Sequence, residues 1–416
     1  MANSEQENRV ESFDVLEHAN IQNPFPLFTK LRSEAPVYWN QKYSFWMVSR
    51  YRDVKWILQQ PQKFSSVTKS MYMERKEELP QNVHASFDIA SRFVHGNLQA
   101  YDPPVHTLHR QAVVKDFMSL VTGVVKTSLE RRVSHLLDAM EQAGSCDFVQ
   151  ALAYPLPSKV IFDLLGVPEE DHEAIRKSSD AMSGFQGAAY SRNADAIVTL
   201  GENFMEAEAV LMRLIESRRR EPKEDLISSL VQPGNVLGQL PDKDIVVLCV
   251  LLLFAGHETT SSLLANSLRY LLQDRRQWEQ LLATPEILPG AVEELLRFVS
   301  PVLWLPRVAQ EDVEMHGSVA PKGAQVLVGF GPANHDAEEF RDPETLDVTR
   351  KNVYSLAFGY GIHTCLGAAL ARMETQVAFS QILKRFPRIQ LLTDKFEYHP
   401  VYFLRALKSL PVAVNA

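Results

Sequence analysis

The sequence predicts a mainly α-helical protein with a minor β part, folded as a single large helical domain with small β-sheets. Three observations support this class. Apolar residues recur at the 3.6-residue period of helices over most of the chain, most continuously at 194–220 and 242–273. Short runs of β-branched and aromatic residues gather near the two ends. No internal repeat, low-complexity tract or linker divides the 416 residues, so we expect one domain over 1–416 that begins with a loosely ordered segment at 1–22.

The first hundred residues combine short helices with a β-hairpin. Two prolines open a short amphipathic helix at 24–32. The runs 37–39 and 45–48 are β-branched and aromatic and are separated by a polar turn, which predicts the hairpin. The segment 51–59 has a helical period. From 65 to 100 the periodicity is lost, and a loop of this length inside a compact domain is usually functional or disordered.

Helical patterns separated by short breaks fill the middle of the chain. In order, we expect helices that start at 105 and that span 120–140, 156–165, 194–220 and 242–273, with breaks at 167–168 and 184–189. The first half of the 242–273 pattern is apolar on every side, which is typical of a helix buried in the middle of a large domain. This helix is therefore the expected centre of the core.

Toward the C-terminus, short helices and strands alternate with irregular stretches. In order, we expect a helix at 291–298, strands at 313–315 and 325–328, an irregular stretch at 332–352, a strand at 354–358, a helix at 368–383 and short strands within 389–414. The glycine-rich stretch 358–367 joins the expected strand to the following helix. We therefore expect it to form a tight loop directly before a helix N-terminus.

Composition and charge exclude several functional classes. The formal net charge is −8, whereas a nucleic-acid binder usually carries a net basic patch, so we expect no nucleic-acid partner. The residues 1–14 lack the apolar region of a signal peptide, and the longest apolar run, 245–255, falls short of the roughly 20 residues that span a bilayer. We therefore expect no membrane anchor and a cytoplasmic location. Three cysteines without zinc-site spacing fit the reducing cytosol.

One cysteine, Cys365, stands out by its position in the glycine-rich loop. Gly359, Gly361 and Gly367 surround it, and glycine permits positive φ or close approach of another group to the backbone. The helix expected to follow presents unpaired N–H groups and a partial positive charge at its N-terminus. Both lower the pKa of a thiol, so Cys365 is a candidate thiolate. From these features alone it is either a nucleophile or a metal ligand.

The spacing F-x-x-G-x-H-x-C-x-G in this loop resembles the haem-binding loop of the cytochrome P450 family, in its soluble bacterial type. The resemblance extends from about 23 to 411, and it implies the cytochrome P450 fold and haem b (iron protoporphyrin IX) as cofactor. It also implies that Cys365 is the axial ligand of the haem iron. The same resemblance assigns cofactor contacts to the loop residues Phe358, Gly359, His363 and Gly367.

The segment Ala255-Gly256-His257-Glu258-Thr259 lies in the middle of the buried helical pattern. A mid-helix glycine costs about 1 kcal/mol relative to alanine. An ionisable Glu258 in an apolar run costs more unless it is paired or solvated, so we expect a groove or bulge with water there. A kinked core helix whose glutamate reaches the surface remains an alternative. In the family resemblance, Glu258 is the acid and Thr259 the alcohol that deliver protons to dioxygen, and Ala255 leaves room beside the haem.

Charged residues elsewhere match two further features of the family. Glu294 and Arg297 are three apart on an expected helix, and with Arg350 they resemble the family's structural brace behind the haem.

Cations are also needed for the two haem propionates, because buried carboxylates require partners. The residues that match the family's propionate contacts are His106, Arg110, Arg307 and His363. Surface ion pairing is the alternative for each alone. The chain departs from the pattern at Ser355, where relatives often carry histidine.

Positions that line the substrate site in the family are apolar in this chain. They are Leu251, Phe254, Leu303, Leu305, Phe403 and Leu404. Ordinary core packing is the alternative reading of each. The segments 65–100 and 182–190 match the family's mobile lid. The lining indicates a lipophilic substrate such as a polyketide, terpenoid, steroid or fatty acid, and a place in secondary metabolism.

The resemblance implies an oxidoreductase, a monomeric monooxygenase that inserts one oxygen atom from O₂ into a lipophilic small molecule, by hydroxylation or epoxidation. No nucleotide-binding glycine motif occurs, so we expect electrons from a separate ferredoxin or flavodoxin with its reductase. Lys115 and Arg372 are candidate docking cations. The alternatives are a peroxygenase, an oxidative-coupling or isomerising enzyme of the same fold, a haem sensor or carrier, and a non-haem cysteine enzyme.

Overall fold

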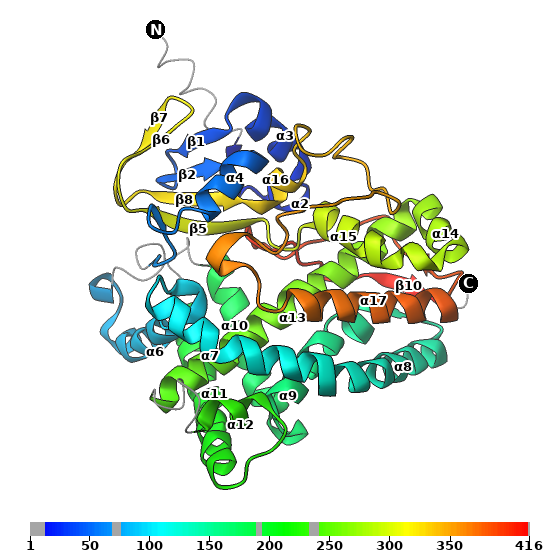
Figure 1. Ribbon diagram of the computed structural model, residues 1–416, viewed down its shortest axis with the longest axis horizontal. Coiled ribbons are helices and arrows are strands. Elements are labelled where there is room, and N and C mark those ends of the chain that lie inside the picture. Colours follow the sequence, from blue (N-terminus) through cyan, green and yellow to red (C-terminus); the bar gives the residue numbers. More distant parts are fainter. Residues whose placement is uncertain (1–12, 69–75, 189–193, 233–240, 415–416) are drawn as a thin grey trace. The chain divides into compact units, whose positions relative to one another are not determined.

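The computed structural model describes residues 13–68, 76–188, 194–232 and 241–414 (Figure 1). The chain divides into two compact units. One comprises Met1–Ser65, Val133–Tyr154 and Thr259–Ala416, and the other comprises Ser66–Arg132 and Pro155–Glu258. The boundary at Glu258 falls inside the longest helix, α13 (Asp242–Gln273). The single domain over 1–416 stays a prediction.

A five-stranded sheet is the main β element of the first unit. Its order is β1 (Val37–Asn40), β2 (Phe45–Val48), β8 (Gln325–Gly329), β5 (Trp304–Ala309) and β3 (Phe64–Ser65). Strands β1 and β2 form the predicted hairpin, with Trp39 opposite Trp46. Strand β8 pairs parallel to β2 and antiparallel to β5, so it occupies the centre of the sheet (Figure 1).

The core of this unit forms where helix α4 (Tyr51–Leu58) packs against the sheet. Its buried residues Val54, Ile57 and Leu58 follow the i, i+3, i+4 spacing of one helix face. They join Val328 of β8 and residues of the later irregular stretch in one buried cluster. The glycine-rich loop meets this core, because a β-carbon on Gly361 would lie 2.4 Å from the carbonyl oxygen of Leu58.

The remaining elements of the first unit are helices around this core and short strand pairs. The helices are α2 (His18–Gln22), α3 (Phe25–Glu34), α14 (Arg275–Ala283), α15 (Leu288–Val299), α16 (Phe330–Asn334) and α17 (Ala368–Arg385). The strands are β4 (Ser145–Asp147), β9 (Gln390–Leu391) and β10 (Pro411–Ala413) in one sheet, and β6 (Val313–Met315) with β7 (Ser318–Ala320) in another. Helix α8 (Lys126–Ala143) begins in the second unit and ends in the first.

The described residues of the second unit form helices joined by turns and loops, and no strand occurs among them. Its helices are α6 (His84–His95), α7 (Val105–Leu120), α9 (Pro155–Leu165), α10 (His172–Ala188), α11 (Ala194–Arg220), α12 (Leu226–Val231) and the first half of α13. Helices α6 and α11 approach closely. The rings of Phe93 and Phe204 are 3.9 Å apart, and a β-carbon on Gly201 would lie 2.7 Å from Cβ of Ser86. Glycine at 201 therefore permits this contact.

Three predictions about secondary structure are wrong. The stretch 65–100 is not a structureless loop, because α6 forms within it and buries Phe87, Ala90 and Phe93. The break within 182–190 is absent up to Ala188, where α10 ends; residues 189–193 lie outside the described part. The strand at 354–358 does not form. The loosely ordered segment expected at 1–22 stays a prediction, because residues 1–12 lie outside the described part. Within it, Phe13 is buried and Asp14 binds Lys42.

Helix α13 matches its predicted boundaries and its predicted burial. By length and composition it is the one helix among the described residues that could cross a membrane, but 72% of its most apolar window is buried. A buried core helix meets the same criterion, and the apolar first half of α13 has that character.

Candidate functional site

Cys365 is the exposed cysteine of the three in the chain. Cys249 is fully buried within α13, and burial raises the pKa of its thiol to about 12. Burial also raises the pKa of Cys146. A cysteine with a raised thiol pKa is a poor source of thiolate at neutral pH. Cys365 lies three residues before the first residue of α17, an 18-residue helix whose N-terminus favours a negative charge. It is therefore the best-placed cysteine for thiolate chemistry.

The loop that carries Cys365 is fixed by its own backbone. The N–H of Cys365 donates to the carbonyl of Phe358 at 2.9 Å, and the N–H of Gly359 donates to that of Leu356 at 2.8 Å. Gly359 and Gly361 have φ of 71° and 74°, in the left-handed region that favours glycine. His363 ends a short 3-10 turn, Gly361–His363, and is half-buried. The loop therefore presents the sulfur from a defined turn.

The predicted brace residues meet in the interior of the first unit. Glu294 and Arg297 are both 0% exposed, and their side chains form two hydrogen bonds of 2.7 and 2.8 Å. Arg350 lies beside them, with its Nε 3.0 Å from Oε2 of Glu294. A buried charge pair of this kind is stable only when its geometry and remaining hydrogen bonds are good, and both conditions hold here.

A buried asparagine that sequence analysis missed connects the brace to the cysteine loop. Arg297 donates to the backbone carbonyl of Asn334 at 2.8 Å. The side chain of Asn334 accepts a 2.7 Å hydrogen bond from the N–H of Leu356. Leu356 in turn accepts from Gly359 in the loop. Asn334 therefore holds the segment 354–358 through its side chain, which explains why no strand ladder forms there.

The four candidate propionate cations divide equally between the two units. In the first unit, Arg307 on β5 is nearly buried and its Nη1 donates to the carbonyl of Pro306 at 2.7 Å, while His363 lies in the cysteine loop. In the second unit, His106 and Arg110 share one face of α7. Burial and then the charge of Arg110 lower the pKa of His106, so its neutral form is favoured.

The middle of α13 is an uninterrupted α-helix, so the expected bulge does not form in its backbone. Glycine at 256 instead serves packing, because a β-carbon there would lie 2.9 Å from Cδ1 of Ile161 on α9. Ala255, Glu258 and Thr259 are half-buried, whereas His257 is fully buried.

An acidic residue that sequence analysis did not single out lies beside this segment. The ligand-type atoms of Asp180 on α10, His257 and Glu258 all lie within 4.8 Å of one another. Asp180 is 78 positions from Glu258 in the sequence, a separation that no local pattern reveals.

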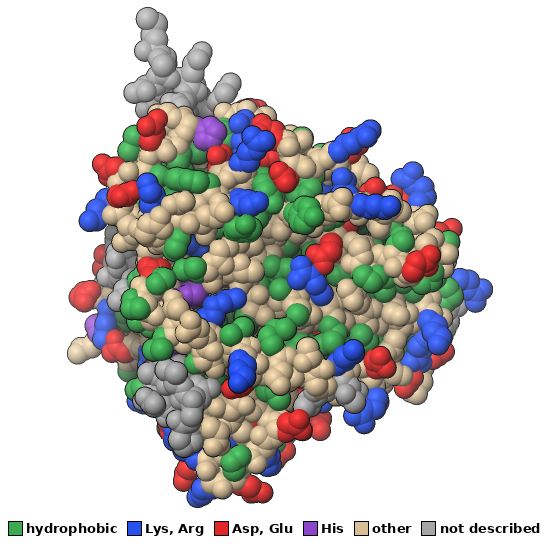
Figure 2. All heavy atoms as spheres, viewed as in Figure 1, with side chains coloured by type: hydrophobic (Ala, Val, Ile, Leu, Met, Phe, Trp, Pro, Cys, Tyr) green, Lys and Arg blue, Asp and Glu red, His purple; other side chains and the backbone are tan. Residues whose placement is uncertain are grey.

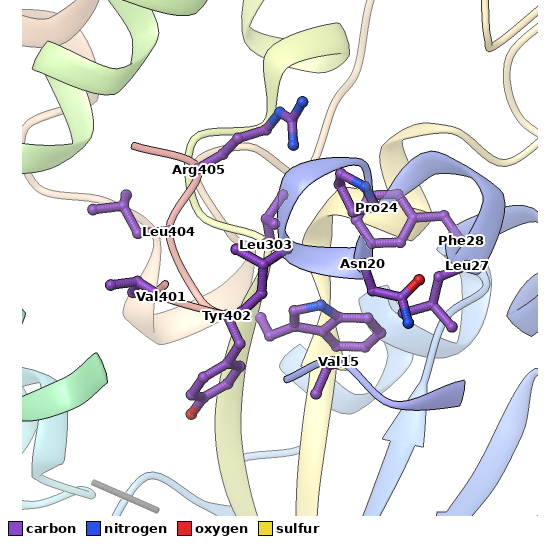
Figure 3. A pocket seen from close by; sticks show the side chains of 12 residues that line it. Val15, Asn20, Pro24, Leu27, Phe28, Leu303, Val401, Tyr402, Leu404 and Arg405 are labelled. Atoms are coloured by element: carbon purple, nitrogen blue, oxygen red, sulfur yellow. The ribbon is translucent and has the colours of Figure 1, made fainter. Parts of the chain in front are cut away.

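The predicted substrate-lining residues are buried or half-buried, and two of them line a small cavity in the first unit. Leu303 and Leu404 surround it together with residues of the N-terminal segment and Arg405 (Figure 3). The cavity holds about 10 Å³, roughly the space of one water molecule, so it does not hold a substrate. The amide of Leu303 donates to the carbonyl of Phe403 at 2.7 Å, which places these residues side by side.

Similarity to known proteins extends over nearly the whole chain. A family model described as Cytochrome P450 matches residues 24–395. Polyketide biosynthesis cytochrome P450 PksS of Bacillus subtilis (strain 168) is 34% identical over an alignment of 402 residues, which covers 94% of this chain and 96% of that protein.

Solved structures give the same result for the fold. CYP109E1 from Bacillus megaterium in complex with testosterone has a TM-score of 0.82 at 33% identity, over 95% of this chain and 100% of that one. P450BioI in complex with acyl carrier protein ligated to hexadec-9Z-enoic acid has a TM-score of 0.85 at 30% identity, again over 95% and 100%. The chain thus belongs to the cytochrome P450 family, whose members are monooxygenases that bind haem through a cysteine thiolate.

Proposed function

We propose that Cys365 is the axial ligand of the haem iron, and that the chain inserts one oxygen atom from O₂ into a lipophilic small molecule. The observation that carries this proposal is the contrast among the three cysteines. Cys365 is exposed in a loop fixed before α17, whereas the pKa values of Cys249 and Cys146 are raised by burial. A cysteine binds iron as the thiolate and not as the thiol, so Cys365 is the fitting donor among the three cysteines.

The residues present fit a haem group. The cysteine loop offers an accessible sulfur, and its two positive-φ glycines carry no side chain that would cover it. Arg307 and His363, in the same unit as the cysteine loop, supply cationic or hydrogen-bonding groups suited to carboxylates. A bound haem with a thiolate ligand supplies the reductive cleavage of dioxygen.

The protein's own part in the reaction is to position groups and supply protons. We assign Glu258 as the acid and Thr259 as the alcohol. Both are half-buried near the middle of α13, where a carboxyl group can exchange protons with solvent and pass them to the neighbouring hydroxyl. The brace of Glu294, Arg297 and Arg350 acts through Asn334 on the backbone of the cysteine loop, so its role is structural.

We infer a lipophilic substrate from two kinds of support. The predicted lining positions are all apolar, and relatives of known structure are described with testosterone or corticosterone and with a fatty acyl chain on its carrier protein. Spin-state titration of the ferric protein with testosterone, corticosterone and hexadec-9Z-enoic acid tests this class. A saturable shift of the Soret band with one of these three compounds supports a lipophilic substrate. Tighter binding of small polar molecules than of all three compounds would contradict it.

We propose a ferredoxin or flavodoxin with its reductase as the electron source, and a cytoplasmic monomer as the working form. On the face drawn in Figure 2, basic and acidic side chains are interspersed, so docking would depend on local cations. Arg372, a candidate cation, is bound to Glu293 at 2.5 and 3.0 Å, and its guanidinium lies 4.5 Å from the ring centroid of Phe358. Lys115 is exposed and therefore the stronger candidate.

A further inference from the structure

Three ionisable side chains from two helices converge in the second unit. Asp180 is on α10, and His257 and Glu258 are on α13. Their ligand-type oxygen and nitrogen atoms all lie within 4.8 Å of one another. At this distance, one bridging water or a small side-chain rotation is enough to connect two of these atoms by hydrogen bonds. The cluster therefore connects the proposed acid, Glu258, to a second carboxyl group.

The cluster is open to solvent at Asp180, and its histidine is fully buried. The side chain of Asp180 is 38% exposed, Glu258 is half-buried and His257 is 0% exposed. Asp180 is therefore accessible to protons from bulk water. Two carboxyl groups this close do not ionise independently, because the negative charge of one favours the protonated form of the other.

A charged pair orients the outer carboxyl group. Nη1 of Arg176 donates to Oδ2 of Asp180 at 2.6 Å, and Nη2 of Arg176 donates to Glu173 at 2.7 Å. The adjacent Lys177 lies 3.8 Å from Glu206 of α11, so its charge is directed to another partner. A guanidinium does not release its proton at physiological pH, so Arg176 fixes Asp180 in place without carrying protons itself.

We propose that Asp180 supplies protons to Glu258 during the oxygenation reaction. Asp180 acts only through Glu258, so it is a positioning residue. In each cycle Glu258 gives up its proton toward the reacting dioxygen. Asp180 then transfers a proton to the Glu258 carboxylate and is reprotonated by water, so one proton enters for each one consumed. This inference rests on the proposed function of Glu258.

Two substitutions at Asp180 test the proposal in the holoenzyme, with the substrate identified by spin-state titration. Asp180→Asn removes the exchangeable proton but keeps the size of the side chain, and Asp180→Glu restores the acid. We expect Asp180→Asn to raise hydrogen peroxide released per NADPH several-fold and to lower product by a similar factor, and Asp180→Glu to recover most of the coupling. Glu173→Gln, at the exposed outer end of the same charged chain, is the matched control and should remain coupled.

A second readout does not depend on turnover. Infrared titration of the resting ferric protein follows the protonated carboxyl band that Glu258→Gln removes. Loss of the neighbouring negative charge in Asp180→Asn should move this titration to lower pH, which a purely structural role of Asp180 would not do.

The outcomes separate this inference from the proposed function. Normal coupling and an unmoved carboxyl titration in Asp180→Asn, together with uncoupling in Glu258→Gln, overturn the role of Asp180 alone. Normal coupling in Glu258→Gln overturns the assignment of the acid and this inference with it. Failure to bind haem overturns the proposed function itself.

Discussion

A β-carbon on Gly361 would lie 2.4 Å from the backbone carbonyl oxygen of Leu58, a separation that real side chains do not adopt. The cysteine loop and the end of α4 therefore touch through backbone atoms. Gly361 also has φ of 74°, so it meets two requirements that no other residue type satisfies.

Substitution of Gly361 by alanine should therefore displace the loop and lower haem retention. The φ penalty alone is roughly 1–2 kcal/mol, and the contact with Leu58 adds to it. Gly359→Ala is the matched control, because Gly359 has φ of 71° but the nearest atom to its added β-carbon is 3.8 Å away. Haem content and thermal unfolding of both variants check this. Equal loss in the two variants would show that the contact with Leu58 contributes nothing.

The brace should respond strongly to removal of one charge. Glu294→Gln leaves Arg297 buried without its carboxylate, and breaking a buried pair costs about 3–5 kcal/mol. The matched control is Glu173→Gln, which breaks an exposed pair with the same three-residue spacing and should cost only a few tenths of a kcal/mol. Urea denaturation measures both values. Similar small losses in the two variants would contradict a stabilising role for the brace.

Stability should fall between about pH 4.5 and pH 8 because of a buried carboxyl group on α17. Burial raises the pKa of Glu374 to about 8, and Oε2 of Glu374 has no hydrogen-bond partner among the described residues. The folded state thus retains a proton that the unfolded state loses from about pH 4.5 upward. The contribution of this group to stability is complete below that pH and is lost as the pH rises through about 8.

Glu374→Gln should remove this pH dependence. We expect wild type to lose on the order of a few kcal/mol between pH 5 and 8, and the variant to lose clearly less over the same range. Denaturation curves at several pH values provide the measurement. If the free energy of unfolding of the two proteins changed with pH in parallel, the carboxyl group of Glu374 would not keep its proton in the folded state, and the prediction would fail.

Thr259→Ala should uncouple electron consumption from product formation. Without the hydroxyl next to Glu258, proton supply to dioxygen is impaired, while electron delivery does not depend on this side chain. We expect NADPH consumption to continue, product to fall and peroxide to rise. Thr259→Ser, which keeps the hydroxyl, should behave like wild type. Unchanged coupling in Thr259→Ala would contradict the role of the alcohol.

Sequence analysis predicted the fold class because its strongest signals were long and periodic. Helix α13 matched at both ends, and the fold class is confirmed by the solved structures of relatives. The errors lie where local patterns are weak. Helix α6 is short and lacks a side-chain cap, and α10 continues past Gly184, which the sequence presents as a break. In both, neighbouring α11 supplies packing that no local propensity contains.

The site was predictable where it depends on short motifs and not where it depends on distant contacts. The cysteine loop, the α13 segment and the brace pair each lie within one stretch of sequence. Asn334 and Asp180 lie close to residues that are far away in the chain. Their roles follow from tertiary packing alone, so only the structure reveals them.

The central claim, that Cys365 binds the haem iron as a thiolate, is tested most directly by the absorption spectrum of the reduced, carbon monoxide-bound protein. Wild type should show the red-shifted Soret band of a thiolate-ligated haem, Cys365→Ala should lose it, and Cys249→Ala should keep it. A red-shifted band that persists in Cys365→Ala, or a wild-type protein that binds no haem, would contradict the account.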